Sequence, residues 1–292
     1  MRPSYFNEIF DEAGSLRGPY EPLLEVYRSL GEDEVGRRIG RAQERLRELG
    51  ATFPVDDGTG DSERMLPVDW VPRIIAADEW RTLSEGLLQR GRAINAWLQA
   101  VYGAGQDLVP EEIVRGSVFY RPHELPSGSP PVHIYGPDMV HLASGEYVVL
   151  EDNVRVPSGI AYSEAIRRVG MEAMPELYDA YRVAEIFSYY DRLRETLELA
   201  APDGVEEPNV AVVTRGGDDP AFFEHRRIVE VGDVVMMTLA EYLVSEGFVF
   251  AREDGRSVDT DLPEQKRAYL EGNVGPSGIY VCLSHASTEA AE

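Results

Sequence analysis

The chain of 292 residues is 43% hydrophobic and 27% charged, which is typical of a globular protein with a buried core and excludes a disordered one. A net charge of −24 and an isoelectric point near 4.6 argue against nucleic acid as a partner, because no basic patch is present to neutralise phosphates. The single cysteine, Cys282, excludes an internal disulfide, and no apolar leader or run of about 18 apolar residues occurs. We therefore expect a cytoplasmic protein that does not enter a membrane.

The basic residues are unusual, because Lys266 is the one lysine among 28 lysines and arginines. A strongly acidic chain that uses arginine almost exclusively indicates a GC-rich organism, and one adapted to salt. This observation concerns habitat and says nothing about activity.

Apolar residues at helical spacing predict helices over residues 22–30, 35–49 and 79–102. The Gly- and Asp-rich segment 51–62 predicts a loop between the helical start and the next block. A second loop is predicted over residues 122–131, where Pro, Ser and Gly are frequent.

A β-hairpin with converging oxygen atoms is predicted over residues 138–153. A Ser-Gly turn at 144–145 precedes a strand over 146–150, so antiparallel pairing brings Asp138 beside Glu151. Glu151 and Asn153 are two residues apart, and on an extended chain their side chains share one face. Hard oxygen ligands in small number suit Mg²⁺, which completes its coordination with water and substrate phosphates. The hairpin thus predicts a site for nucleotide-dependent phosphoryl transfer.

After the hairpin, strands alternate with helices, which predicts an α/β segment. The predicted helices cover residues 164–169, 177–199 and 239–245, and the predicted strands cover residues 210–214, 234–237 and 248–251. Other nucleotide and hydrolase motifs are absent: the chain has no Gly-x-Ser-x-Gly, no phosphate-binding P-loop and no Gly-x-Gly-x-x-Gly after a strand.

Residues 147–159 read YVVLEDNVRVPSG, which resembles a recurrent segment of the circularly permuted type 2 ATP-grasp family. Further segments resemble the same family, and together they lie between about residues 5 and 245. They are FNEIFDEAGSLRGPYEPLLE at 6–25, PVDWVPRII at 67–75, GLLQR at 86–90, HIYGPD at 133–138, NVAVVT at 209–214 and FFEH at 222–225.

The resemblance implies a ligase that phosphorylates a carboxylate with ATP and joins the acylphosphate to an amine. Asp138 and Glu151 are then expected to hold Mg²⁺, with Asn153 completing a second ion. Arg155 is the candidate for stabilising charge on the transferring phosphoryl group; the alternative is a surface arginine. The cofactors implied are ATP and Mg²⁺, and the partners are a small carboxylate and an amine, with peptide-like substrates suggested by likeness to glutathionylspermidine synthase.

Other residues keep two interpretations each. Ser158 and Gly159 are either backbone donors to a bound carboxylate or nucleotide, or part of a structural turn. Arg73, embedded among apolar residues, is either a catalytic, substrate-binding group or half of a core salt bridge. His133 and His225 are each expected to be a hydrogen-bonded core histidine, and the alternative is a catalytic histidine.

The sequence departs from the family pattern after about residue 245. The family's ATP-clamping half carries a lysine on a strand and a Gly-rich lid, whereas Lys266 lies in a polar segment without such a lid. Three explanations stay open: a truncated chain, one half of a split enzyme whose companion chain supplies the adenine pocket, or a degenerate member kept for binding. Two function classes follow, an ATP- and Mg²⁺-dependent carboxylate–amine ligase and a non-catalytic binding or assembly module.

The expected fold class is α/β, with α+β as the alternative, and the architecture is ATP-grasp-like. A helical N-terminal region is expected to pack on a mixed sheet that carries the metal hairpin. The expected domains are residues 1–204, and residues 205–292 as a partial α/β unit with a divergent tail.

Overall fold

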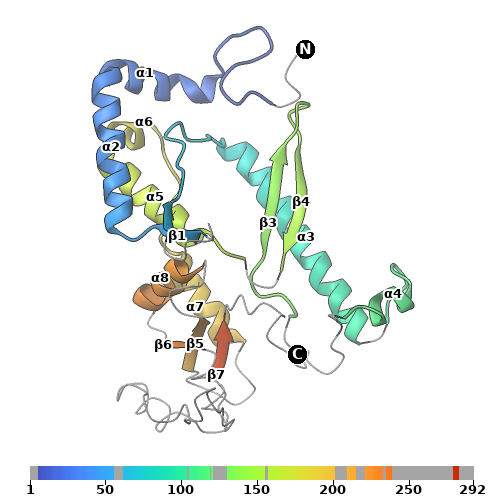
Figure 1. Cartoon of the computed structure of the whole chain (residues 1–292). Coiled ribbons are helices and arrows are strands. Elements are labelled where there is room, and N and C mark those ends of the chain that lie inside the picture. The colour runs from blue at the N-terminus through green and yellow to red at the C-terminus, as the bar shows by residue number, and fades with distance from the viewer. Residues whose placement is uncertain are drawn as a thin grey trace, which may run out of the picture. The chain divides into compact units, whose positions relative to one another are not determined.

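The computed structural model (Figure 1) describes residues 6–55, 62–103, 105–118, 120, 130–154, 157–200, 209–214, 221–232, 235–238 and 279–282. Helices and strands are mixed along the chain, which confirms the α/β class. The chain forms two compact units, each discontinuous in sequence: Met1–Glu21 with Pro72–Pro157, and Pro22–Val71 with Ser158–Glu292. This division differs from the expected domains 1–204 and 205–292, whose boundary falls in residues 201–208, outside the described residues.

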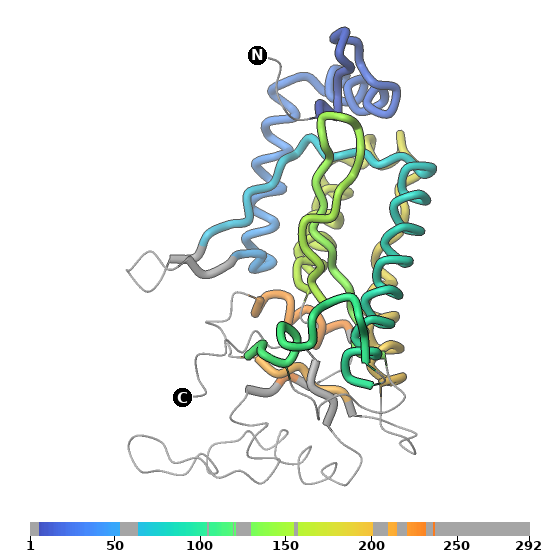
Figure 2. The backbone as a smooth tube through the Cα atoms, turned by 90° about the vertical axis from the view of Figure 1, so that its right-hand side faces the viewer, coloured from blue at the N-terminus to red at the C-terminus, as the bar shows by residue number. Residues whose placement is uncertain are grey.

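The first unit pairs a long helix with a β-hairpin. Its elements are η1 (Gly18–Tyr20), α3 (Ala77–Tyr102), α4 (Glu111–Arg115), β3 (Gly136–His141) and β4 (Tyr147–Asn153). Helix α3 starts two residues before the predicted position and ends at the predicted Tyr102. The Glu79 carboxylate accepts a hydrogen bond from the Ala76 N–H at 3.2 Å, which caps the first turn. Figure 2 shows the hairpin running beside α3.

The second unit contains a helical core and a small parallel sheet. Its elements are α1 (Glu21–Leu30), α2 (Glu32–Glu48), β1 (Thr52–Val55), β2 (Ser62–Met65), α5 (Ile160–Ala173), α6 (Pro175–Ala180), α7 (Tyr189–Leu199), β5 (Asn209–Thr214), α8 (Phe222–Gly232), β6 (Val235–Thr238) and β7 (Ile279–Cys282). Small residues on the facing sides of α2 and α5 let the two helices approach closely, and Phe223 of α8 closes the cluster. The buried members are Ala42, Leu46, Ala51, Ala161, Ala165, Val169 and Phe223.

The parallel sheet has the strand order β6-β5-β7. Its central strand, β5, carries a buried apolar run from Val210 to Val213, as expected of a parallel strand covered on both faces. The predicted strands 210–214 and 234–237 are thus confirmed. Strand β7 was not predicted, and the predicted helix 239–245 and strand 248–251 lie outside the described residues.

The hairpin β3–β4 forms a two-stranded sheet of its own within the described part of the chain, rather than part of a larger mixed sheet. Two further predictions were wrong. The expected loop 51–62 contains strand β1, which pairs with β2. The Tyr162 hydroxyl donates to the Thr52 carbonyl of this strand at 3.0 Å. The expected helix 177–199 is two helices, α6 and α7. In the segment between them, the Ala184 carbonyl accepts from Arg167, a distant partner that local periodicity does not reveal.

Candidate functional site

The predicted pairing of the hairpin is confirmed. Asp138 lies directly opposite Glu151, and Gly136 lies opposite Asn153. Directly opposed residues of an antiparallel pair project their side chains to the same face, and residues two apart on a strand do so as well. Asp138, Glu151 and Asn153 therefore share one face of the hairpin, where the two carboxylates are exposed and the amide is partly buried.

A β-bulge in β4 determines that the Glu151 side chain lies on the same face of the hairpin as Asp138. Asp138 pairs with Glu151 but the next residue, Met139, pairs with Val149, so Leu150 is an extra residue on β4. A bulge reverses the alternation of side chains that follow it. Without the bulge, Glu151 would share a face with Val149; with it, Glu151 joins Asp138 on the opposite face.

The other face of the hairpin is fixed to α3. Arg90 of α3 donates from Nε and Nη2 to the two carboxylate oxygens of Asp152, at 2.7 and 2.6 Å, and the Tyr135 hydroxyl donates to Asp152 at 2.6 Å. The hydrogen bonds from Arg90 and Tyr135 lower the pKa of Asp152 to about 2. Burial, reinforced by the neighbouring Asp152 carboxylate, raises the pKa of Tyr135 to about 12. Asp152 thus faces α3, and the predicted ligands on either side of it, Glu151 and Asn153, face away from α3.

Arg73 pairs with an acid from the N-terminal segment. Its Nε lies 2.9 Å from the Glu8 carboxylate, which also lies 3.2 Å from His141 Nδ1. The Arg73 side chain is 59% exposed, so the prediction of a core salt bridge was wrong about burial: the pair lies at the surface. A catalytic or substrate-binding role for Arg73 stays a prediction. Arg155 lies outside the described residues.

Ser158 and Gly159 precede α5, and this helix start already holds a carboxylate. The N–H of Gly159 donates to Glu224 of α8, and so do the N–H groups of Ile160 and Ala161. Glu224 is only 2% exposed, and burial raises its pKa. The sequence predicts backbone donors for an anion at this position, and an internal side chain uses them; a nucleotide role for exposed Ser158 and for Gly159 stays a prediction.

The two histidines expected in the core differ. His225 is buried, and its Nδ1 lies 2.9 Å from the Thr214 hydroxyl, which confirms the prediction. His133 is exposed and precedes β3, so its predicted core position was wrong. The sequence did not predict the ion pairs of Glu8 and Arg90 or the hydrogen bonds that Glu224 accepts. Each of these residues lies far in sequence from its partner.

The hairpin fits a cation that keeps most of its own water. Among the described residues, no group of three or more His, Cys, Asp and Glu side chains gathers into a metal cage. Two exposed carboxylates and one amide on a shared face are all-oxygen donors, too few for a closed site and suited to Mg²⁺ with water and phosphate ligands. The residues present therefore fit the predicted ion.

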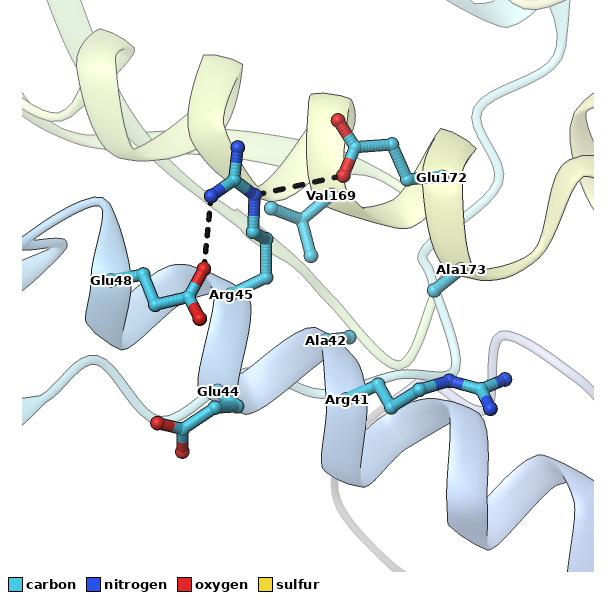
Figure 3. A pocket seen from close by; sticks show the side chains of 8 residues that line it. All are labelled: Arg41, Ala42, Glu44, Arg45, Glu48, Val169, Glu172 and Ala173. Carbon is cyan, nitrogen blue, oxygen red and sulfur yellow. Dashed lines mark hydrogen bonds and ion pairs between the residues drawn. The ribbon is translucent and has the colours of Figure 1, made fainter.

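An open groove of about 380 Å³ lies between α2 and α5 within the second unit (Figure 3). Arg45 lies there between Glu48, at 2.9 Å, and Glu172, at 3.8 Å. The other charged residues of the lining, Arg41 and Glu44, pair with Glu34 and Arg47 of α2. None of the predicted site residues lines the groove.

Comparison with known proteins decides the family. Residues 72–261 match the family described as circularly permuted ATP-grasp type 2. The chain belongs to this family. The match covers both strands of the hairpin, so the exposed face with Asp138, Glu151 and Asn153 is a feature of an ATP-grasp chain.

Several curated proteins resemble this ATP-grasp chain. A Frankia alni protein named "Putative glutamate--cysteine ligase 2-3" is 36% identical over 269 residues, which cover 89% of this chain and 31% of the relative. An uncharacterised Synechocystis protein is 35% identical over 256 residues, covering 85% of this chain and 53% of the relative. An uncharacterised Mycobacterium tuberculosis protein is 30% identical over 279 residues, covering 91% and 49%. The chain thus spans between about a third and a half of the length of these relatives.

No helix in the described ranges has the length and apolar character needed to cross a bilayer.

Proposed function

We propose that this chain carries the cation-binding part of an ATP- and Mg²⁺-dependent carboxylate–amine ligase. The observation that carries the proposal is the pairing of Asp138 with Glu151 on one exposed face of a hairpin, in a member of the ATP-grasp family. Bound there, Mg²⁺ would supply the positive charge that phosphoryl transfer from ATP requires.

In this proposal each residue has a defined part. Asp138 and Glu151 hold the ion from opposite strands, and Asn153 adds a neutral oxygen beside them. Arg155 and Arg73 are proposed to neutralise charge on the transferred phosphoryl group and the substrate. Ser158 and Gly159 are proposed to lie near the nucleotide. The Gly159 N–H can donate to the nucleotide only if its hydrogen bond to the Glu224 carboxylate breaks.

The reaction proposed is amide formation through an acylphosphate. A carboxylate oxygen attacks the γ-phosphorus of ATP and ADP leaves; an amine nitrogen then attacks the acyl carbon, and phosphate leaves with formation of the amide. The name of the Frankia alni relative mentions glutamate and cysteine, so we propose amino acids or short peptides as the substrate pair. We further propose that the complete activity includes the segments present in the longer relatives, supplied by a continuing or companion chain in the cytoplasm.

The first test is calorimetric titration of the chain with ATP, with and without Mg²⁺. Glu151→Gln keeps the shape of the side chain and removes its charge, and Glu146→Gln makes the same change near the turn of the same hairpin. We expect Mg²⁺-dependent binding that Glu151→Gln weakens at least about tenfold, as for loss of a charged ligand, and that Glu146→Gln leaves unchanged.

Equal binding by Glu151→Gln and wild type would contradict the assignment of the ligands. Absence of Mg²⁺-dependent ATP binding by the wild-type chain would contradict a nucleotide site in this chain alone and favour the non-catalytic binding module.

A further inference from the structure

Asp152 stands between two proposed cation ligands and is turned the other way. Its neighbours Glu151 and Asn153 face away from α3, whereas both oxygens of Asp152 are bound by Arg90 of that helix. Two parallel hydrogen bonds from a planar guanidinium fix the rotation of a carboxylate as well as its position. The Tyr135 hydroxyl binds the Oδ1 atom of the same group, so the Asp152 side chain has three short hydrogen bonds.

A glycine in α3 leaves room for the Tyr135 ring beside Arg90. At Gly91, next to Arg90, an added Cβ would lie 3.3 Å from the Tyr135 ring, closer than most such contacts. Glycine here allows the ring to pack on the helix surface beside the arginine. Tyr135 and Arg90 thus meet at one turn of α3, and Asp152 binds to both.

The hydrogen bonds from Arg90 and Tyr135 to Asp152 hold a part of β4 whose register is weakly fixed by the main chain. The bulge at Leu150 immediately precedes Glu151, and a bulge interrupts the ladder of main-chain hydrogen bonds that otherwise fixes register. A shift of one residue would turn Glu151 and Asn153 to the opposite face. Binding of Asp152 to α3 selects the register in which both ligands share the exposed face with Asp138.

We propose that Arg90, Asp152 and Tyr135 are positioning residues for the cation site, and this proposal rests on the proposed function. They touch neither the ion nor the substrate, and they act through the orientation of Glu151 and Asn153. Groups that orient metal ligands in this way typically change metal affinity 10- to 100-fold when removed. By contrast, Arg90 and Asp152 are 48% and 27% exposed, and a pair at the surface contributes little to stability.

Charge and position make opposite predictions for one variant. Arg90→Gln removes a positive charge near the proposed cation, so electrostatics alone would tighten cation binding. If Arg90 positions the ligands, the same variant weakens binding. Arg92→Gln removes the same charge from an exposed residue of the same helix and is the matched control.

The experiment is titration of the full chain with Mn²⁺, an oxygen-seeking substitute for Mg²⁺ that electron paramagnetic resonance detects directly. We expect Arg90→Gln and Asp152→Asn to weaken Mn²⁺ binding by about 10- to 100-fold, and Arg90→Lys to restore part of the loss. Tyr135→Phe, which changes no charge and keeps the ring that packs against Gly91, is expected to weaken binding several-fold. Arg92→Gln is expected to bind as wild type, and thermal unfolding of each variant reports whether the fold is kept.

The outcomes separate this inference from the function on which it rests. If Glu151→Gln loses Mn²⁺ while Arg90→Gln and Tyr135→Phe bind as tightly as wild type, the positioning role is wrong and the cation site stands. If wild type binds no Mn²⁺, or Glu151→Gln binds it unchanged, the cation site itself is wrong and the positioning role falls with it. Should Arg90→Gln not fold, Tyr135→Phe alone decides.

Discussion

At the residue scale, the start of α5 depends on one glycine and one buried acid. Gly159 has φ of 111° and ψ of −12°, a backbone conformation that side chains strongly disfavour. This conformation directs its N–H, together with those of the next two residues, at the Glu224 carboxylate. The sequence predicts a turn with backbone donors here. It does not show that α8 supplies the acceptor, because Glu224 lies 65 residues away.

We expect Gly159→Ala to destabilise the protein by about 1–3 kcal/mol, because the methyl group forces a strained φ and disturbs the donors to Glu224. Gly40→Ala is the matched control, since Gly40 lies within α2 with nothing within 4 Å of an added Cβ. That change should stabilise the protein by about 0.5–1 kcal/mol through helix propensity. Urea unfolding of both variants measures the difference, and equal effects of the two substitutions would refute the role assigned to Gly159.

At the element scale, an ion pair between the buried Glu164 carboxylate and the partly exposed Arg227 joins α5 to α8. Both oxygens of Glu164 accept from Arg227 at 2.9 Å, and Arg168 adds a contact from one turn further along α5. Burial alone would raise the pKa of Glu164, but the hydrogen bonds from Arg227 and Arg168 outweigh it and lower that pKa. The lowered pKa means that ionised Glu164 stabilises the folded state.

We therefore expect Glu164→Gln to lose about 1–3 kcal/mol of folding free energy at pH 7, where the wild-type acid is fully ionised. The contribution is present above the pKa of the unfolded chain, about 4.5, and is lost as the pH falls through the lower folded value. The difference between variant and wild type should thus shrink below about pH 4.5. Denaturation at several pH values tests this, with exposed Glu195→Gln as control. A difference that stayed constant down to pH 3 would contradict the ion-pair account.

Some of these elements could be predicted from the sequence and others could not. A turn at Ser144-Gly145 predicts the pair of Asp138 and Glu151, because a hairpin pairs residues at equal distances from its turn. The structure has this pair for another reason: the strands pair symmetrically about Ser144 as far as Met139 and Val149, and the bulge at Leu150 then shifts the partner of Asp138 to Glu151. The bulge was not predictable, since nothing in the spacing marks which strand carries an extra residue. Helices α1, α2 and α3 follow from periodicity alone. The split between α6 and α7 does not, because contacts from distant segments override a pattern that would continue a helix.

At the scale of the whole molecule, two charge effects oppose each other. Many arginines form exposed ion pairs with carboxylates on the same helix, such as Arg194 with Glu198, and salt weakens these pairs. Each such pair contributes only about 0–1 kcal/mol. The net charge of −24 makes the folded chain repel itself, and salt weakens this repulsion as well. Because the acids so outnumber the bases, the repulsion should dominate.

We expect the unfolding temperature at pH 7 to rise between 0.1 and 1 M KCl, as the screening length falls from about 10 to about 3 Å. Each kcal/mol gained should raise the midpoint by about 2–4 °C. The control is the same comparison near the isoelectric point of 4.6, where the net charge vanishes and the benefit of salt should largely disappear. Calorimetry or circular dichroism measures both. A midpoint that fell with salt at pH 7 would mean that the ion pairs outweigh the net charge, and would argue against the predicted adaptation to salt.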